Sequence, residues 1–209
     1  MATDLAALVA PATTAVLTME MQRGIIGDLA RLTGLRDEVD AAGAVGNAAR
    51  LLDAARASGA TVAHCTAAFR PDRRGSNDNA PMFQFAAREP DHLVIGTPSA
   101  ELLPELGPVD GDLLIERVHG MTPFTGTSLD PELRNLGIDT VIATGVSVNI
   151  GIFGLVVEAI NLGYRVVVAT DAVAGVPAEY AKAVLDNSIR MLATLRSVDE
   201  IIAAWGVSK

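Results

Sequence analysis

Short apolar runs rich in β-branched residues alternate with helix-like stretches along almost the whole chain. Runs with the length and the flanking turn residues of buried strands occupy residues 14–19, 61–65, 112–115, 140–144 and 165–169. Helical spacing is found over residues 37–57, 100–103, 129–136, 152–162 and 178–195, and a last helix begins after Ser197 and reaches Trp205. This alternation predicts an α/β fold in which helices cover both faces of a mostly parallel sheet.

The size of the chain fits one domain with a substantial core. It has 209 residues, half of them hydrophobic, and no linker-like or repeated segment divides it. We therefore expect a single domain over residues 1–209.

Charge and composition exclude several classes of function. A formal net charge of −9 argues against nucleic acid as a partner, because phosphate binding needs a clustered basic surface. The compact basic cluster of Arg70, Arg73 and Arg74 is diluted by nearby aspartates, which is typical of a solvated loop. No apolar run reaches the roughly 20 residues needed to span a membrane, so no membrane partner is expected. The amino-terminal residues lack the basic start of a signal peptide, so we expect a cytoplasmic protein.

The content of potential metal and thiol ligands is also low. Cys65 is the single cysteine, which rules out an intrachain disulfide and any site built from several thiolates. The histidines and carboxylates show no metal-ligand spacing, so neither a metal nor another cofactor is expected.

The most informative stretch is Gly-Val-Ser-Val-Asn-Ile-Gly over residues 145–151. It joins the apolar run at 140–144 to the helix predicted at 152–162, and therefore leads from the carboxyl end of a strand into the start of a helix. Ligands of open α/β sheets bind at such places. Glu20 and Arg117 follow two other predicted strands, so their side chains are expected at the same edge of the sheet.

Five motifs in this order resemble those of the isochorismatase-like hydrolases of the cysteine hydrolase superfamily. They lie at residues 16–22, 96–102, 124–129, 145–151 and 163–172. The resemblance implies a three-layer, doubly wound sheet of six strands. It also implies a homodimer or homotetramer whose subunit contacts help to close the pocket, and a cis peptide bond near Val146–Ser147.

In the thiol hydrolases of that family an Asp, a Lys and a nucleophilic Cys act together. These positions fall on Glu20, Arg117 and Gly151, so the chain resembles a member that lacks the nucleophile. Glycine cannot attack a carbonyl group, whereas a thiolate can form an acyl-enzyme. The true isochorismatases of the family also carry glycine here; in them an acid protonates a vinyl ether and water then adds.

Two hypotheses remain open. In the first, the protein hydrolyses a small anionic metabolite without a covalent thioester, with Glu20 as general acid or base and Arg117 as an anion clamp. In the second, it is an inactive member that binds a small metabolite or serves as an oligomeric scaffold. Both place substrate contacts at Gln22, His119, Phe124, Ser147 and Asn149. A third, weaker hypothesis recruits Cys65 as nucleophile, although a buried structural thiol is the favoured interpretation.

Overall fold

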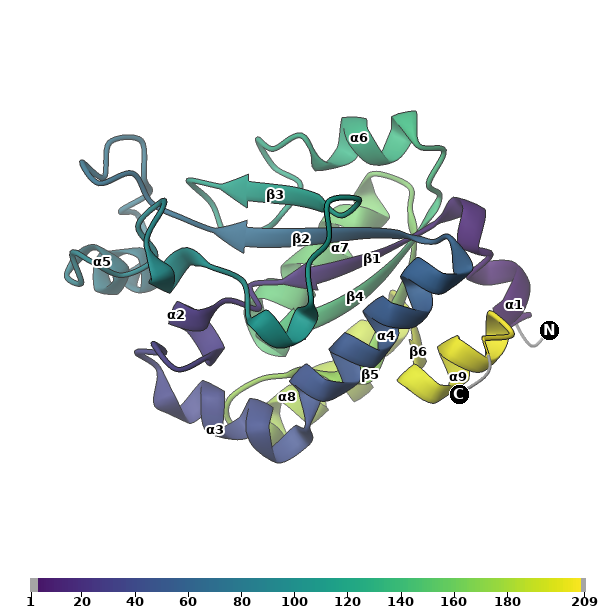
Figure 1. The fold of residues 1–209 in the computed structure, drawn as a ribbon. Helices are drawn as coiled ribbons and strands as arrows, with labels where there is room; N and C mark the ends of the chain where they lie inside the picture. The colour runs from purple at the N-terminus through teal and green to yellow at the C-terminus, as the bar shows by residue number, and fades with distance from the viewer. Residues whose placement is uncertain (1–3, 208–209) are drawn as a thin grey trace.

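The computed structural model describes residues 4–207 and contains one six-stranded, all-parallel sheet (Figure 1). The strands lie in the order β3-β2-β1-β4-β5-β6. Their bounds are β1 Thr14–Met19, β2 Thr61–Ala67, β3 Leu113–Arg117, β4 Thr140–Val146, β5 Arg165–Ala174 and β6 Thr194–Arg196. The order reverses between β1 and β4, as expected for a doubly wound sheet.

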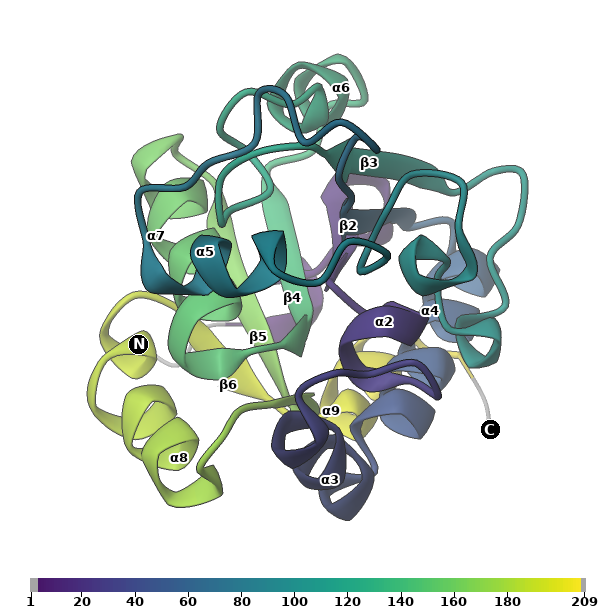
Figure 2. The same cartoon turned by 90° about the vertical axis from the view of Figure 1, so that its left-hand side faces the viewer.

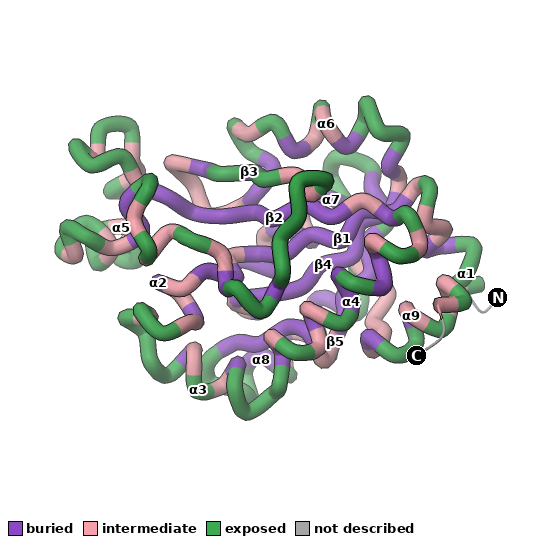
Figure 3. The backbone as a smooth tube through the Cα atoms, in the orientation of Figure 1, coloured by how far each residue is buried: buried purple, intermediate pink, exposed green. Residues whose placement is uncertain are grey.

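Helices cover both faces of the sheet, which confirms the predicted three layers. One face packs against α3 (Thr33–Ala42), α4 (Ala44–Ser58) and α9 (Val198–Ala204), and the other against α6 (Leu129–Asn135), α7 (Phe153–Asn161) and α8 (Ala178–Asn187). Neighbouring residues of one strand point to opposite faces of the sheet. Val16 packs in the core beneath α3, α4 and α9, and Leu17 packs in the core beneath α6, α7 and α8. Figure 3 shows the resulting pattern, with the central strands buried and the outer surfaces of the helices exposed.

Smaller elements complete the chain. The short α-helices are α1 Leu5–Leu8, α2 Arg23–Ile26 and α5 Pro81–Ala87. Single turns of 3-10 helix lie at Pro11–Thr13, Pro98–Ala100, Pro104–Leu106 and Ile189–Met191, and a π-helical turn at Val148–Ile152 leads into α7. The helix predicted at residues 100–103 is therefore replaced by two 3-10 turns that flank it.

The predicted helix over residues 37–57 is two helices. α3 and α4 meet at Gly43, whose φ of +61° is left-handed and ends the first helix. The predicted helix over residues 178–195 is also wrong at its end: α8 stops at Asn187, and β6 begins seven residues later. β6 pairs with Val167–Ala169 of β5 and forms the sheet edge that the sequence did not locate.

Capping at the start of α9 agrees with the sequence. Ser197 and Glu200 form a reciprocal capping box. Asp171 accepts a hydrogen bond from the backbone of Val198 (2.8 Å), so its carboxylate caps a turn.

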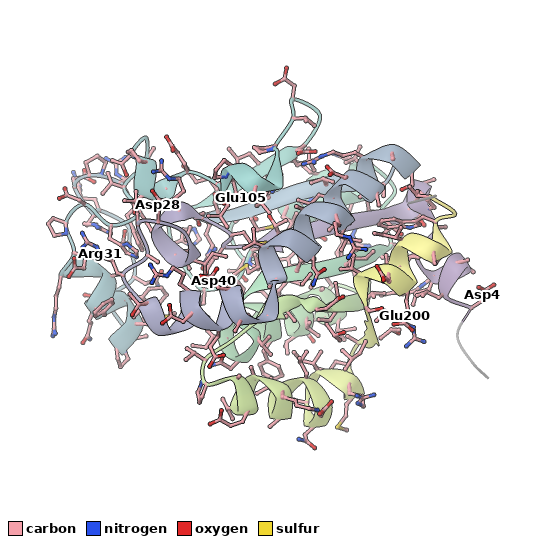
Figure 4. All side chains as sticks on the ribbon, turned by 60° about the horizontal axis from the view of Figure 1, so that its bottom comes forward. Asp4, Asp28, Arg31, Asp40, Glu105 and Glu200 are labelled. Atoms are coloured by element: carbon pink, nitrogen blue, oxygen red, sulfur yellow. The ribbon has the colours of Figure 1, made fainter. Side chains whose placement is uncertain are left out.

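Many charged side chains of the protein lie on its surface. Figure 4 shows Asp4, Asp28, Arg31, Asp40, Glu105 and Glu200 distributed around the surface, and each of them is exposed. Within residues 4–207, no helix has both the length and the apolar character required to cross a membrane.

The carboxyl ends of the strands meet at one end of the molecule. Figure 2 looks onto this end, where α5 lies in front of the sheet and α2 and α3 lie beside it. The crevice beyond β1 and β4, where the strand order reverses, is the expected ligand position in such a sheet.

A buried polar network joins the sheet to α4 away from this end. His64 is 1% exposed; its Nε2 lies 3.1 Å from Asp112 Oδ2 and its Nδ1 lies 2.9 Å from Thr18 Oγ1. Because a carboxylate only accepts hydrogen bonds, Nε2 carries the proton and Nδ1 accepts from the threonine hydroxyl. Asp112 also receives a 2.7 Å bond from Arg56 of α4. This arrangement fits a neutral imidazole.

Stability is therefore expected to fall as the pH drops below about 6.5. Burial lowers the pKa of His64 from its ordinary value of 6.5, outweighing the opposing effect of Asp112. Between the lowered folded value and 6.5 the unfolded chain binds a proton that the folded chain does not, so acid favours unfolding, by at most about 1.4 kcal/mol per pH unit. Urea unfolding of wild type and His64→Gln between pH 8 and pH 5 measures this. A slope that is the same in both proteins would contradict the prediction.

Candidate active site

Glu20 stands immediately after β1 in an unusual backbone conformation. Its φ of +54° is left-handed, which is uncommon outside glycine and often found at functional sites. Its N–H still extends the sheet by donating to the carbonyl oxygen of Cys65 at 2.9 Å. The side chain remains 21% exposed, so the carboxylate reaches the crevice from the last sheet-like position of the chain.

Arg117 ends β3 and pairs directly with Glu20. Its side chain is only 4% exposed, and Nη2 donates to Glu20 Oε1. The other edges of the guanidinium face backbone: Nε lies 3.3 Å from Gly120 O and Nη1 lies 3.5 Å from Thr66 O. The guanidinium of Arg117 therefore holds the side chain of Glu20 in place, and few of its N–H groups remain to bind a ligand.

Gly151 lies in the π-helical turn after β4, and there the backbone is adapted to glycine. A Cβ atom at this position would lie 2.7 Å from Val146 O and 3.3 Å from Met19 Cε. The peptide bond Val146–Ser147 is cis, as the resemblance implies. Gly151 is buried and does not line the cavity described below.

Gly151→Cys is expected to destabilise the protein by about 1–3 kcal/mol without creating a thiol hydrolase. The new Cβ would approach backbone oxygen more closely than real Cβ atoms do, so the turn would have to shift. Urea unfolding measures the first effect, and trapping of a covalent acyl-enzyme the second. Gly46→Cys, at an exposed helical site with no atom within 4 Å, is the control. A stable Gly151→Cys variant that forms a thioester would refute the prediction.

A cavity of about 220 Å³ opens at the carboxyl end of the sheet. Five of the residues predicted from the sequence line it: Glu20, Arg117, His119, Ser147 and Asn149. The structure thus brings together residues from the ends of β1, β3 and β4.

Two other predicted contacts lie elsewhere. Gln22 is fully buried, and its amide pairs with the peptide of Ala67 in both directions, donating to O at 2.9 Å and accepting from N at 2.8 Å. Gln22 also donates to Ala100 O. Phe124 is 5% exposed and stacks on Tyr164 with ring centroids 5.7 Å apart. Neither side chain lines the cavity; Gln22 ties the segment after Glu20 to the end of β2, and Phe124 belongs to the core.

An apolar wall of the cavity was not predicted from the sequence. Phe69, Phe83 and Phe85 line it from the long connection between β2 and β3. Leu35 of α3 and Met121 close other sides. A signal was present, since three of the five phenylalanines of the chain fall within a segment that is otherwise largely polar.

Arg73 organises this connection. Its guanidinium lies 4.4 Å from the ring centroid of Phe69 and donates to the carbonyl oxygens of Glu89 and His92. Arg70, in contrast, pairs with the neighbouring Asp72 at the surface. The basic cluster is thus largely a solvated loop, as predicted, except that Arg73 supports the wall of the cavity.

The isochorismatase domain model matches residues 14–200 of the chain. The chain belongs to the isochorismatase family.

The relatives of this isochorismatase-family chain include both uncharacterized proteins and an enzyme. It is 32% identical over 202 residues to the uncharacterized isochorismatase family protein YecD of Escherichia coli O157:H7. The aligned region covers 92% of this chain and 96% of YecD. It is 29% identical over 175 residues to the ureidoacrylate amidohydrolase RutB of Rhizobium rhizogenes, and this aligned region covers 78% of this chain and 70% of RutB. Among solved structures, an isochorismatase family protein from Desulfovibrio vulgaris matches with a TM-score of 0.78 at 29% identity. The matched region covers 91% of this chain and 98% of that one.

Cys65 is buried in this isochorismatase-family chain. It is 1% exposed within β2, and burial raises the pKa of its thiol to about 12, so the thiolate is scarce at neutral pH. It is not among the residues that line the cavity. Within residues 4–207, no group of three or more His, Cys, Asp or Glu side chains is arranged to hold a metal ion.

Proposed function

We propose that this site hydrolyses a small metabolite without a covalent intermediate, with water as the nucleophile and Glu20 as the proton-transferring group. The observation that carries the proposal is the Glu20–Arg117 pair. The partly exposed carboxylate of Glu20 lines the cavity, and the buried guanidinium of Arg117 forms an ion pair with it. Membership of a hydrolase family and similarity to a relative named as an amidohydrolase support an amide as the bond cleaved.

Glu20, held by Arg117 at the cavity, would act first as a base. Glu20 would take a proton from water, and the resulting hydroxide would attack the substrate carbonyl carbon to give a tetrahedral adduct. The same proton would then pass from Glu20 to the leaving nitrogen as the carbon–nitrogen bond breaks. Ser147 and Asn149, which line the cavity beside Glu20, would orient the substrate.

The alternative is a binding protein without turnover. It is favoured by the replacement of all three residues of the thiol triad, at positions 20, 117 and 151. It predicts that ligands raise the melting temperature while no product forms.

A panel of small amides and isochorismate, tested with wild type and Cys65→Ser protein, decides between these proposals. We expect product formation by both proteins, no inhibition by thiol-alkylating reagents, and no acyl-enzyme trapped by hydroxylamine. Turnover that disappears with Cys65→Ser would instead show a thiol mechanism. Thermal stabilisation without product across the panel would favour the binding protein.

A further inference from the structure

We propose that the substrate of this site is a neutral molecule with an apolar body, such as an aryl or branched-alkyl carboxamide, and not an anion. The inference rests on the proposed hydrolase function for the bond that is cleaved. The affinity that it predicts is independent of turnover.

Apolar side chains from separate segments of the chain surround the cavity. Leu35 comes from α3, Phe69 follows β2, Phe83 and Phe85 come from α5, and Met121 follows β3. Ligand sites lined in this way gain most of their affinity from apolar contact, and their few polar groups set orientation. The wall therefore fits an apolar substrate body.

The cavity has room for such a group. Its volume of about 220 Å³ exceeds the ~150 Å³ of an apolar cavity that binds benzene. A single aromatic ring with a short amide-bearing chain fits this size, whereas the smallest metabolites would leave apolar surface uncovered.

The charges in the cavity disfavour an anion. Arg117 is the only Lys or Arg among the described lining residues, and its charge is already compensated by Glu20. Burial lowers the pKa of His92, which disfavours a positive charge on this lining imidazole. A substrate carboxylate would lose its hydration against apolar walls and approach Glu20, and the described lining residues offer no uncompensated Lys or Arg to offset this.

The polar end of the cavity suits a carboxamide. Ionised Glu20 only accepts hydrogen bonds, so it favours a substrate that presents N–H groups. Glu20 and the apolar side chains line the same cavity, so one ligand can meet an acceptor and an apolar surface together.

The test uses two probes that differ only at the polar end: 3-phenylpropanamide and 3-phenylpropanoate. Isothermal titration calorimetry is done at pH 8, where an ordinary imidazole is neutral. We expect the amide to bind wild-type protein at least about tenfold more tightly than the carboxylate. In Glu20→Gln protein the charge of Arg117 is no longer compensated, so the carboxylate is expected to gain affinity. Equal or tighter binding of the carboxylate by wild type would overturn the proposal, and so would tighter binding of the cation 3-phenylpropylamine than of the amide.

Wall variants locate the binding. Phe83→Ala is expected to weaken amide binding by about tenfold, because it removes an aromatic contact. Met191→Ala, at a residue that is 84% exposed and does not line the cavity, is the control and should leave affinity unchanged. Tight amide binding without hydrolysis would support the substrate class and refute the hydrolase. Turnover confined to anionic amides would refute the substrate class and support the hydrolase.

Discussion

Replacing Glu20 by Gln is expected to lower the hydrolysis rate by roughly 100- to 10,000-fold while the protein stays folded. Glutamine keeps the size of the side chain and can still contact Arg117, but it cannot take a proton from water, and general acid–base catalysis contributes a factor of this order. Steady-state rates with the best amide of the panel, together with a circular dichroism spectrum, measure both parts of the prediction.

Matched variants separate catalysis from charge. Glu116→Gln removes a carboxylate from the exposed neighbour of Arg117 on β3 and should leave the rate unchanged. Glu20→Asp keeps the charge but shortens the reach by one methylene, so an intermediate rate is expected. If Glu20→Gln retains the wild-type rate, Glu20 is not the proton-transferring group.

Arg117→Met is expected to destabilise the protein by about 3–5 kcal/mol, toward the lower end because water reaches Glu20 in part. The substitution leaves the carboxylate of Glu20 without its cation, and it removes the donors that face Thr66 O and Gly120 O. Methionine fills a similar volume, so the loss reflects the polar contacts and not a cavity. Urea unfolding at pH 7 gives the free energy.

The double variant Glu20→Gln with Arg117→Met tests the origin of that effect. It should recover part of the loss, because the uncompensated carboxylate is then gone. Arg165→Met is the surface control: Arg165 is 59% exposed and pairs with Asp139, so its loss should be below about 1 kcal/mol. Equal effects of Arg117→Met and Arg165→Met would show that the Glu20–Arg117 pair contributes no more than a surface ion pair.

The sequence predicted the centre of the fold well and its edges less well. β1 and β4 are short, β-branched and buried on both faces, and the structure has them where the pattern predicts them. β6 escaped detection because it has only three residues, all half-buried, after a stretch with helical spacing. Its pairing with β5 is a long-range contact that local periodicity does not reveal.

Some residues of the candidate site could be predicted from the sequence and others could not. Glu20 and Arg117 lie together at one edge of the sheet, as expected, because the parallel arrangement brings the carboxyl ends of the strands together. Gln22 was predicted to touch substrate, yet its partners, Ala67 and Ala100, lie far along the chain and become visible only in three dimensions. The aromatic wall was missed because residues 68–97 follow no regular period.

The seven residues of α5 have a consequence for the history of this protein. None of them is buried, although Met82, Phe83 and Phe85 face the cavity. Substitutions there can change what the cavity accepts at little expense in folding stability, since few core contacts are lost. By contrast, changes at Glu20 or Arg117 disturb an ion pair anchored in the sheet. Selection could therefore change which ligands the cavity accepts through α5 alone, with the Glu20–Arg117 pair at the strand ends unchanged.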